Sequence, residues 1–100
     1  MNMQQMMAQA QKMQRELRKA QAELAAKEFV VSKGGAVTVT VMGNKQIKSV
    51  NVDKDAFDAD NKEMVEDMIA LAINEALDKI DEENEAINER ITGQPGGLGF

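Results

Sequence analysis

The 100-residue chain contains no cysteine and no histidine. These absences remove imidazole bases, thiolate nucleophiles and the usual zinc ligands, which argues against an enzyme and against a metal site. Disulfides are excluded as well, so the fold needs no oxidising compartment, and we expect a cytoplasmic protein. The sequence also lacks a signal-peptide pattern and any run of about 18 apolar residues, so we expect no membrane partner.

Aromatic residues, proline and glycine are also scarce. There are three phenylalanines and no tryptophan or tyrosine, too few for an aromatic platform that stacks on single-stranded nucleic acid. The single proline and four of the seven glycines fall in residues 93–100. We therefore predict one domain over residues 1–92, followed by a flexible glycine-rich tail over residues 93–100.

Charge is distributed unevenly along the chain. The formal net charge is −5, which at first disfavours a nucleic-acid partner. Residues 1–52 nevertheless carry eight basic and three acidic side chains, whereas residues 53–90 carry four basic and fourteen acidic ones. This asymmetry is typical either of one cationic binding face or of the simple solvation of long helices.

Residues 3–27 have the pattern of one long helix. Apolar side chains recur at alternating spacings of three and four residues from Met3 to Leu24, which is a heptad seam. Asn2 and Gln5 match a capping box at the start of this helix. A narrow seam of this kind favours packing on another helix over burial in a broad core.

Residues 28–52 have the pattern of a three-stranded antiparallel meander. Strict alternation of valine and threonine predicts a middle strand with one apolar face, and shorter apolar runs predict its two neighbours. Glycines at Gly34 and Gly43 supply the turns. Ile47 is out of phase with the later valines of the third strand, which predicts a bulge near Lys48.

Residues 61–92 have the pattern of a second long helix. Asp60 and Glu63 predict a capping box at its start. A broad apolar face over its first half, which includes Met64 and Leu71, is suited to cover the sheet, and a narrower seam follows. The predicted fold is therefore α+β, of order α-β-β-β-α, with a three-stranded antiparallel meander packed against two long helices.

The acidic connector between sheet and second helix suggests a calcium loop at first sight. An EF-hand loop needs glycine at its sixth position and glutamate at its twelfth, and loops that start at Asp53 or Asp58 have neither. We predict that these acids cap helices and face solvent. The sequence indicates no catalytic residue, no metal, no cofactor and no small-molecule substrate.

Cations on the first helix form the candidate for nucleic-acid contact. Spacings of three and four residues place Lys12, Arg15 and Lys19 in one stripe opposite the seam, with Arg18 beside it. There they either bind phosphates or only face solvent. The candidate DNA-binding residues are Lys12, Arg15, Arg18, Lys19 and Lys27. The candidate residues of a helix seam or dimer contact are Met6, Met13, Leu17, Leu24, Ile80, Asn84 and Ile87.

The order of these motifs resembles the YbaB/EbfC family of bacterial nucleoid-associated proteins. The resemblance is carried by MQQMMAQAQKMQ at 3–14, GGAVTVTVMG at 34–43, DNKEMVEDMI at 60–69 and shorter matches between and after them. It implies a cytoplasmic, nucleoid-associated protein that binds duplex DNA. It also implies a homodimer whose projecting helices are shaped like tweezers.

Two functional hypotheses remain open at this point. In the first, a non-enzymatic homodimer binds duplex DNA through the cations of its first helix and influences nucleoid organisation and gene expression. In the second, the chain is a helical protein-interaction module or adaptor, its two seams bind protein partners as yet unknown, and its association with DNA is indirect.

Overall fold

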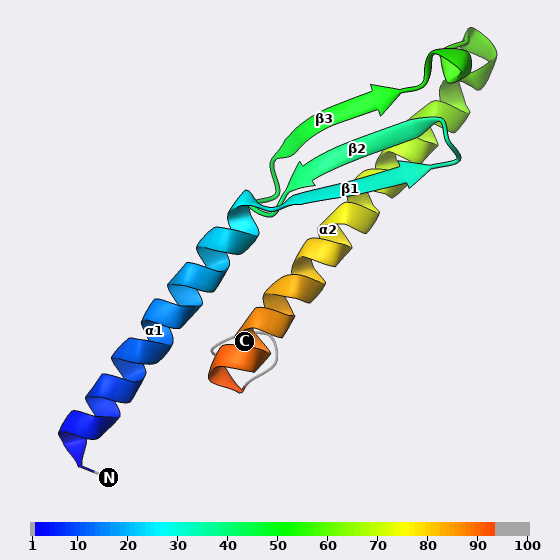
Figure 1. The fold of residues 1–100 in the computed structure, drawn as a ribbon. Coiled ribbons are helices and arrows are strands. Elements are labelled where there is room, and N and C mark those ends of the chain that lie inside the picture. The colour runs from blue at the N-terminus through cyan, green and yellow to red at the C-terminus, as the bar shows by residue number, and fades with distance from the viewer. Residues whose placement is uncertain (1, 94–100) are drawn as a thin grey trace.

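A computed structural model describes residues 2–93 and has the predicted α-β-β-β-α order (Figure 1). The elements are α1 (Met3–Ala26), β1 (Glu28–Lys33), β2 (Val37–Met42), β3 (Ile47–Val52), the short 3₁₀ turns η1 (Lys54–Ala56) and η2 (Ala59–Asn61), and α2 (Lys62–Thr92). The tail predicted over residues 93–100 lies outside the described residues except for Gly93.

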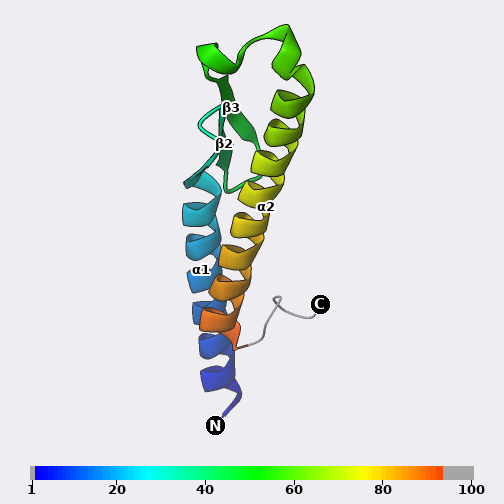
Figure 2. The ribbon, with the colours of Figure 1, turned by 90° about the vertical axis from the view of Figure 1, so that its right-hand side faces the viewer.

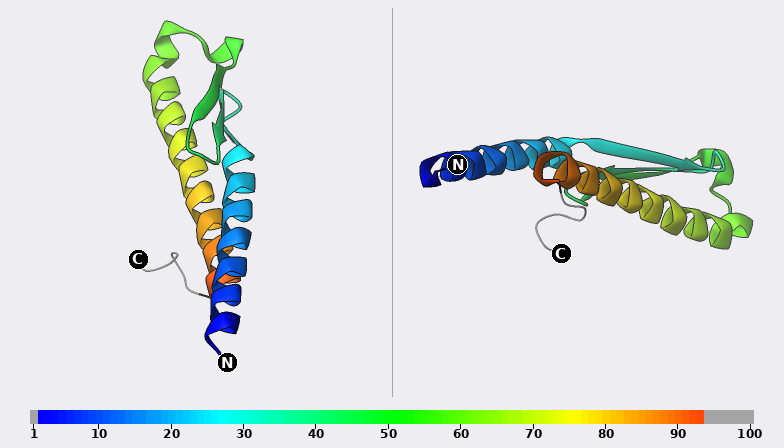
Figure 3. Two further views of the ribbon diagram at one scale, coloured as in Figure 1. Left: turned by 90° about the vertical axis from the view of Figure 1, so that its left-hand side faces the viewer. Right: turned by 90° about the horizontal axis from the view of Figure 1, so that it is seen from below.

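The molecule is a rod that measures 69 × 20 × 15 Å. Helix α2 runs along it, with the sheet packed against its first half and the end of α1 packed against its second half (Figure 2). The first turns of α1 extend beyond the end of α2, as Figure 2 and the left panel of Figure 3 show. The sheet and the N-terminal end of α1 therefore lie at opposite ends of the rod.

Helix α1 begins at the predicted capping box. The Gln5 backbone N–H donates to Asn2 Oδ1 at 2.8 Å, and the Asn2 backbone N–H donates to Gln5 Oε1 at 3.3 Å. These two bonds satisfy donors that a helix start otherwise leaves unpaired. The helix ends where Lys27 adopts an extended conformation and the chain enters β1.

The three strands form one antiparallel sheet in the order β1-β2-β3. Val37, Val39 and Val41 of β2 point to one face and are buried under α2. The register between β2 and β3 shifts between Thr40 and Val41, and Lys48 has no Cα partner there. The predicted bulge is thus confirmed, and it returns Ile47 to the same face as the valines.

Helix α2 covers only part of this apolar face. It lies across β1 and β2, where Ala72 and Ala76 allow close approach to the sheet and are fully buried. Strand β3 is at the far edge, so Ile47 and Val50 remain 50% and 44% exposed although they share the core face. We call Ile47, Val50 and the half-buried Val52 the open β3 face.

Two predictions about α2 are wrong. Asp60 does not cap it, because Asp60 lies in η2 and the N-cap is Asn61, which makes no side-chain cap bond. Met64 and Leu71 do not belong to the buried face and are 41% and 59% exposed. Helix α2 packs on the sheet along a narrow row of buried side chains, and Met64 and Leu71 lie away from that row around the helix.

In the second half of α2, one large buried side chain packs against both α1 and the sheet. Ile80 is 1% exposed and is in the same core cluster as Leu24 of α1 and Val41 of β2. We expect Ile80→Ala to lower the free energy of unfolding by about 2–5 kcal/mol, because it removes buried methyl groups and leaves a cavity. Urea titration at fixed protein concentration measures this loss.

The matched control is Leu71→Ala on the exposed side of the same helix. It is expected to stay within about 0.5 kcal/mol of the wild type, since that side chain is largely in solvent already. Equal losses in the two variants would contradict the packing described above.

Candidate nucleic-acid interface

The cations of α1 form a stripe on the side away from α2. The seam residues Leu17, Ala20 and Leu24 face α2, and the last two are buried. With 3.6 residues per turn, Arg15 points directly away from that seam. Lys12, Arg18 and Lys19 lie on either side of Arg15. All four side chains are exposed, and we call them the α1 stripe.

The α1 stripe has no partner among residues 2–93. The five ion pairs of that region use lysines elsewhere: Lys27–Glu83 (2.6 Å), Lys33–Glu75 (2.9 Å), Lys45–Asp81 (2.9 Å), Lys62–Glu66 (3.0 Å) and Lys48–Glu28. Glu16 and Glu23 lie in the same grooves as Lys12 and Lys19 but form no ion pair with them, so the four cations remain available to an anionic ligand.

One of the five ion pairs lowers the pKa of its carboxyl group. The Lys33 Nζ donates a hydrogen bond to Glu75 Oε1 at 2.9 Å, which holds the pKa of that carboxyl below its usual range. A lowered pKa in the folded state means that the pair stabilises the fold at neutral pH. This contribution is lost as the pH falls through the lowered pKa.

Lys27 differs from the other candidate DNA-binding residues. Its Nζ lies 2.6 Å from Glu83 Oε1 and 5.2 Å from the centroid of the Phe29 ring. Both contacts join the end of α1 to its neighbours in the core. The charge of Lys27 is therefore partly neutralised within the chain, unlike the charges of the α1 stripe.

The packing of the helices adds a cation that the sequence did not suggest. Arg90, near the end of α2, lines a shallow groove together with Lys19 and Glu23 of α1. No ion pair within residues 2–93 includes Arg90. Helical periodicity could not reveal this neighbour, because about 70 positions separate Lys19 from Arg90 in the sequence.

The outer face of α2 has the opposite charge. Asp78, Glu82, Glu85 and Glu89 are exposed and recur at spacings of four, three and four residues. This period places them on the side of α2 opposite Ile80, which faces the core. The two helices thus carry opposite charges on faces that both point away from their shared seam.

The predicted seam residues divide into two groups. Leu24 and Ile80 are buried in the contact between α1 and α2 of one chain, and Leu17, Asn84 and Ile87 are half-buried there. Met6 and Met13 are 57% and 37% exposed, on the part of α1 near and beyond the end of α2. The buried polar residue of α2 is Asn88, at 6% exposure, rather than Asn84.

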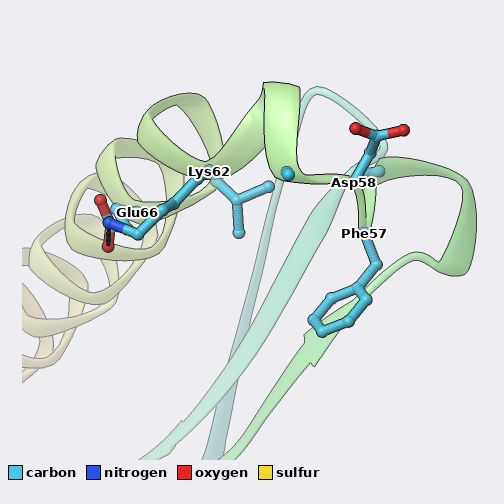
Figure 4. A pocket seen from close by; sticks show the side chains of 7 residues that line it. Phe57, Asp58, Lys62 and Glu66 are labelled. Carbon is cyan, nitrogen blue, oxygen red and sulfur yellow. Dashed lines mark hydrogen bonds and ion pairs between the residues drawn. The ribbon is translucent and has the colours of Figure 1, made fainter.

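An apolar groove of about 310 Å³ lies at the sheet end of the rod, between the connector and the start of α2. Ala56, Ala59 and Val65 line it, and the 81% exposed Phe57 ring stands on the other side of it from Lys62 and Glu66 (Figure 4). Within residues 2–93, no three carboxylates lie close enough together to hold a metal ion.

The acids of the connector have a structural role. Asp53 Oδ1 accepts from the Asp55 backbone N–H at 3.4 Å, and Asp58 Oδ1 accepts from the Asp60 backbone N–H at 2.9 Å. They cap η1 and η2, as carboxylates do at helix starts. Among the described helices, none has the length and apolar character needed to cross a membrane.

These features define a small α+β protein that carries a cationic stripe on a projecting helix. A model of the YbaB/EbfC DNA-binding family matches residues 1–95. The chain belongs to this family, as its motifs suggested.

Individual relatives agree with the family match. A nucleoid-associated protein of Clostridium novyi is 48% identical over 94 residues, which cover 93% of this chain and 82% of that protein. A nucleoid-associated protein of Ruminiclostridium cellulolyticum is 44% identical over 98 residues, which cover 97% and 85%. The crystal structure of an uncharacterized Helicobacter pylori protein has the same fold, with a TM-score of 0.76 at 18% identity over 93% of this chain and 99% of that one.

Proposed function

We propose that the chain is a non-enzymatic, nucleoid-associated protein of the cytoplasm that binds duplex DNA as a homodimer. The observation that carries this proposal is the α1 stripe, whose four cations are exposed and make no ion pair within residues 2–93. Cations of this kind bind phosphates and release counterions, which gives affinity that does not depend on base sequence. The family match and the names of the relatives support the same conclusion.

The α1 stripe supplies the phosphate contacts in this proposal, and Arg90 extends it beside Lys19. Lys27 contributes less, because Glu83 already neutralises much of its charge. The acidic outer face of α2 repels the polyanion and keeps DNA on the α1 side. Affinity is therefore modest, and the net charge of −5 is compatible with binding because the two signs occupy different faces.

Dimerisation doubles the stripe, and the open β3 face is our candidate for the contact. Ile47 and Val50 are apolar, half-exposed and next to the unpaired edge of β3, which is the kind of edge that proteins cover. The exposed Phe57 and its groove lie at the same end of the rod. A symmetric dimer through this end buries both features and leaves two α1 helices projecting from it.

Charges placed on this face are expected to separate the dimer. The Ile47→Glu/Val50→Glu variant should run at the 11.0 kDa chain mass where the wild type runs at twice that mass, because two carboxylates would be buried without partners. Multi-angle light scattering measures the mass. The control is Ser49→Glu, which lies on the opposite face of β3, opposite Thr40, and should remain dimeric.

Two results would contradict this assignment. A wild-type chain that is monomeric at all accessible concentrations would exclude the homodimer. A dimer that persists in the double variant would move the contact to other residues.

The direct test of function is binding of purified protein to a labelled duplex without any other protein. Fluorescence anisotropy should show saturable binding that weakens as salt rises. No binding to bare duplex, together with a pull-down that survives nuclease treatment, would instead support the protein-interaction module.

A further inference from the structure

The free end of α1 combines exposure with an absence of charge. Residues 2–11 contain no charged side chain, yet all of them are exposed in the structure. Met3, Met6 and Met7 are 76%, 57% and 56% exposed. An isolated surface helix normally carries charge on its solvent side, so an uncharged, methionine-rich one indicates a missing partner. We call residues 2–13 the α1 tip.

The α1 tip continues the seam that already binds α2. Met3, Met6, Ala10 and Met13 extend the heptad spacing of Leu17, Ala20 and Leu24 without a break. The last turn of α2 reaches this part of the seam only through Ile91, which lines an open groove of about 510 Å³ with Met6, Ala10 and Met13. Among residues 2–93, the seam thus has a helix partner over its second half and none over its first.

The tip is also formed before any partner arrives. The capping box at Asn2 and Gln5 fixes its first turn, and regular helix continues from Met3 to Ala26. A preformed helix loses little backbone entropy when it docks, so even a short contact can be favourable.

We propose that the α1 tip docks on the α1 tip of a second copy, in an antiparallel helix pair. Met7, Gln9 and Gln14 flank the seam there. The charged side chains at the edge of the groove, Lys12 and Glu16, have opposite signs, so two tips meet without an excess of one charge. DNA is a poor occupant, because residues 2–11 of the tip carry no cation. Arg15 points directly away from the seam, so the α1 stripe stays accessible in the pair except for Lys12, which lines the edge of the groove.

One register satisfies the whole seam. In a two-fold symmetric antiparallel pair, facing residues have numbers with a constant sum, and a sum of 16 pairs Met3 with Met13 and Met6 with Ala10 of the other copy. Each long methionine at position 6 then meets a small alanine, which allows close packing. No other sum pairs the four seam residues of the tip only with one another; a sum of 23 would also use Leu17 and Ala20, which already face α2.

The consequence is an open chain of linked dimers rather than a single closed dimer. The tips lie at the opposite end of the rod from the open β3 face, so a dimer made through that face has two free tips. A pair of tips overlaps over only about 17 Å of helix, so each contact is weak. Proteins concentrated on DNA would nevertheless form it, and two duplexes would be held together; this last step rests on the proposed function.

Engineered cysteines test the pair directly, because the natural chain has none. Met6→Cys and Ala10→Cys proteins, mixed and oxidised mildly, should give a disulfide-linked product at least about ten times faster than either protein alone, because docking raises the effective concentration of the two thiols. The alanine at position 8 faces away from the seam, and an Ala8→Cys protein is the control for random collision.

Two cross-linking outcomes overturn the proposal. One is a mixture that cross-links no faster than the Ala8→Cys control. The other is a Met6→Cys protein that cross-links faster alone than in the mixture, since that would indicate a parallel pair, as between the two arms of one dimer.

A second measurement follows the mass of the assembly. At high concentration the wild type should sediment as species heavier than a dimer, whereas Met6→Glu/Ala10→Glu should remain a dimer and Ala8→Glu should behave as the wild type. A double variant as heavy as the wild type would overturn the proposal. A protein that ends at Gly93 should match the full chain, and loss of its heavier species would assign the contact to residues 94–100 instead.

Different measurements distinguish a failure of the DNA-binding proposal from a failure of the tip proposal. Met6→Glu/Ala10→Glu retains the whole α1 stripe, but it adds two carboxylates near Lys12, so duplex affinity is measured on the Met6→Cys and Ala10→Cys proteins in reducing buffer. These should bind a single duplex within about twofold of the wild type, because every phosphate-binding cation is kept. Loss of cross-linking with intact DNA binding would therefore overturn only the tip contact.

Discussion

The Arg15→Glu/Lys19→Glu variant is expected to bind duplex DNA at least about 100-fold more weakly than the wild type in about 100 mM salt. Both side chains lie in the α1 stripe, and neither has an ion-pair partner within residues 2–93. Their reversal removes two phosphate contacts from each chain and places two carboxylates against the polyanion. In a dimer, four positions change at once.

The matched control has the same change in net charge at other places. Lys54 and Lys79 are exposed and, within residues 2–93, make no ion pair, so Lys54→Glu/Lys79→Glu alters charge without altering α1. Its affinity should fall by less than about tenfold, through long-range repulsion alone. Circular dichroism confirms that both variants stay helical. Equal losses in the two variants would show that net charge, and not the α1 stripe, controls binding.

The Gly43→Ala variant is expected to lose about 3 kcal/mol or more of folding free energy. A Cβ atom on Gly43 would lie 1.7 Å from the Leu24 carbonyl oxygen and 2.5 Å from its carbonyl carbon, both in the backbone of α1. The Gly43 N–H also donates to the Lys27 carbonyl oxygen at 2.8 Å. The hairpin between β2 and β3 therefore has to move away from the end of α1.

The control for this substitution is Gly35→Ala. Gly35 has a positive φ of 67°, but a Cβ atom there would meet nothing within 4 Å, so only the backbone penalty of about 1 kcal/mol remains. Thermal unfolding separates the variants, because a loss of about 1 kcal/mol corresponds to about 4–8 °C for a domain of this size. A Gly43→Ala protein that is as stable as Gly35→Ala would contradict the close approach of hairpin and helix.

The elements that the sequence predicts correctly are those set by local patterns. The Asn2–Gln5 capping box, the alternation of β2 and the bulge at Lys48 depend on residues close together in the chain, and all three are present. The second helix also ends at Thr92 as predicted, and Gly93 follows it with a left-handed φ of 75°. Local conformational preference is enough to place such features.

The features that the sequence did not predict depend on distant partners. Leu71 lies in an apolar pattern but is exposed, because α2 packs on the sheet along a narrower row of residues than the pattern spans. Lys27 has the spacing of a surface cation, and its ion pair with Glu83 follows only from the packing of α1 on α2. Arg90 becomes a neighbour of Lys19 for the same reason. Periodicity identifies a helix face but not what lies across from it.

The central claim is that the α1 stripe of a homodimer binds the phosphates of duplex DNA. The most direct measurement is the slope of log K against log salt concentration for wild-type protein of known oligomeric mass. Eight contacting cations predict a slope of about −7, and about half of that for Arg15→Glu/Lys19→Glu at salt concentrations low enough for it to bind. A slope near zero, or the same slope in both proteins, would contradict the account.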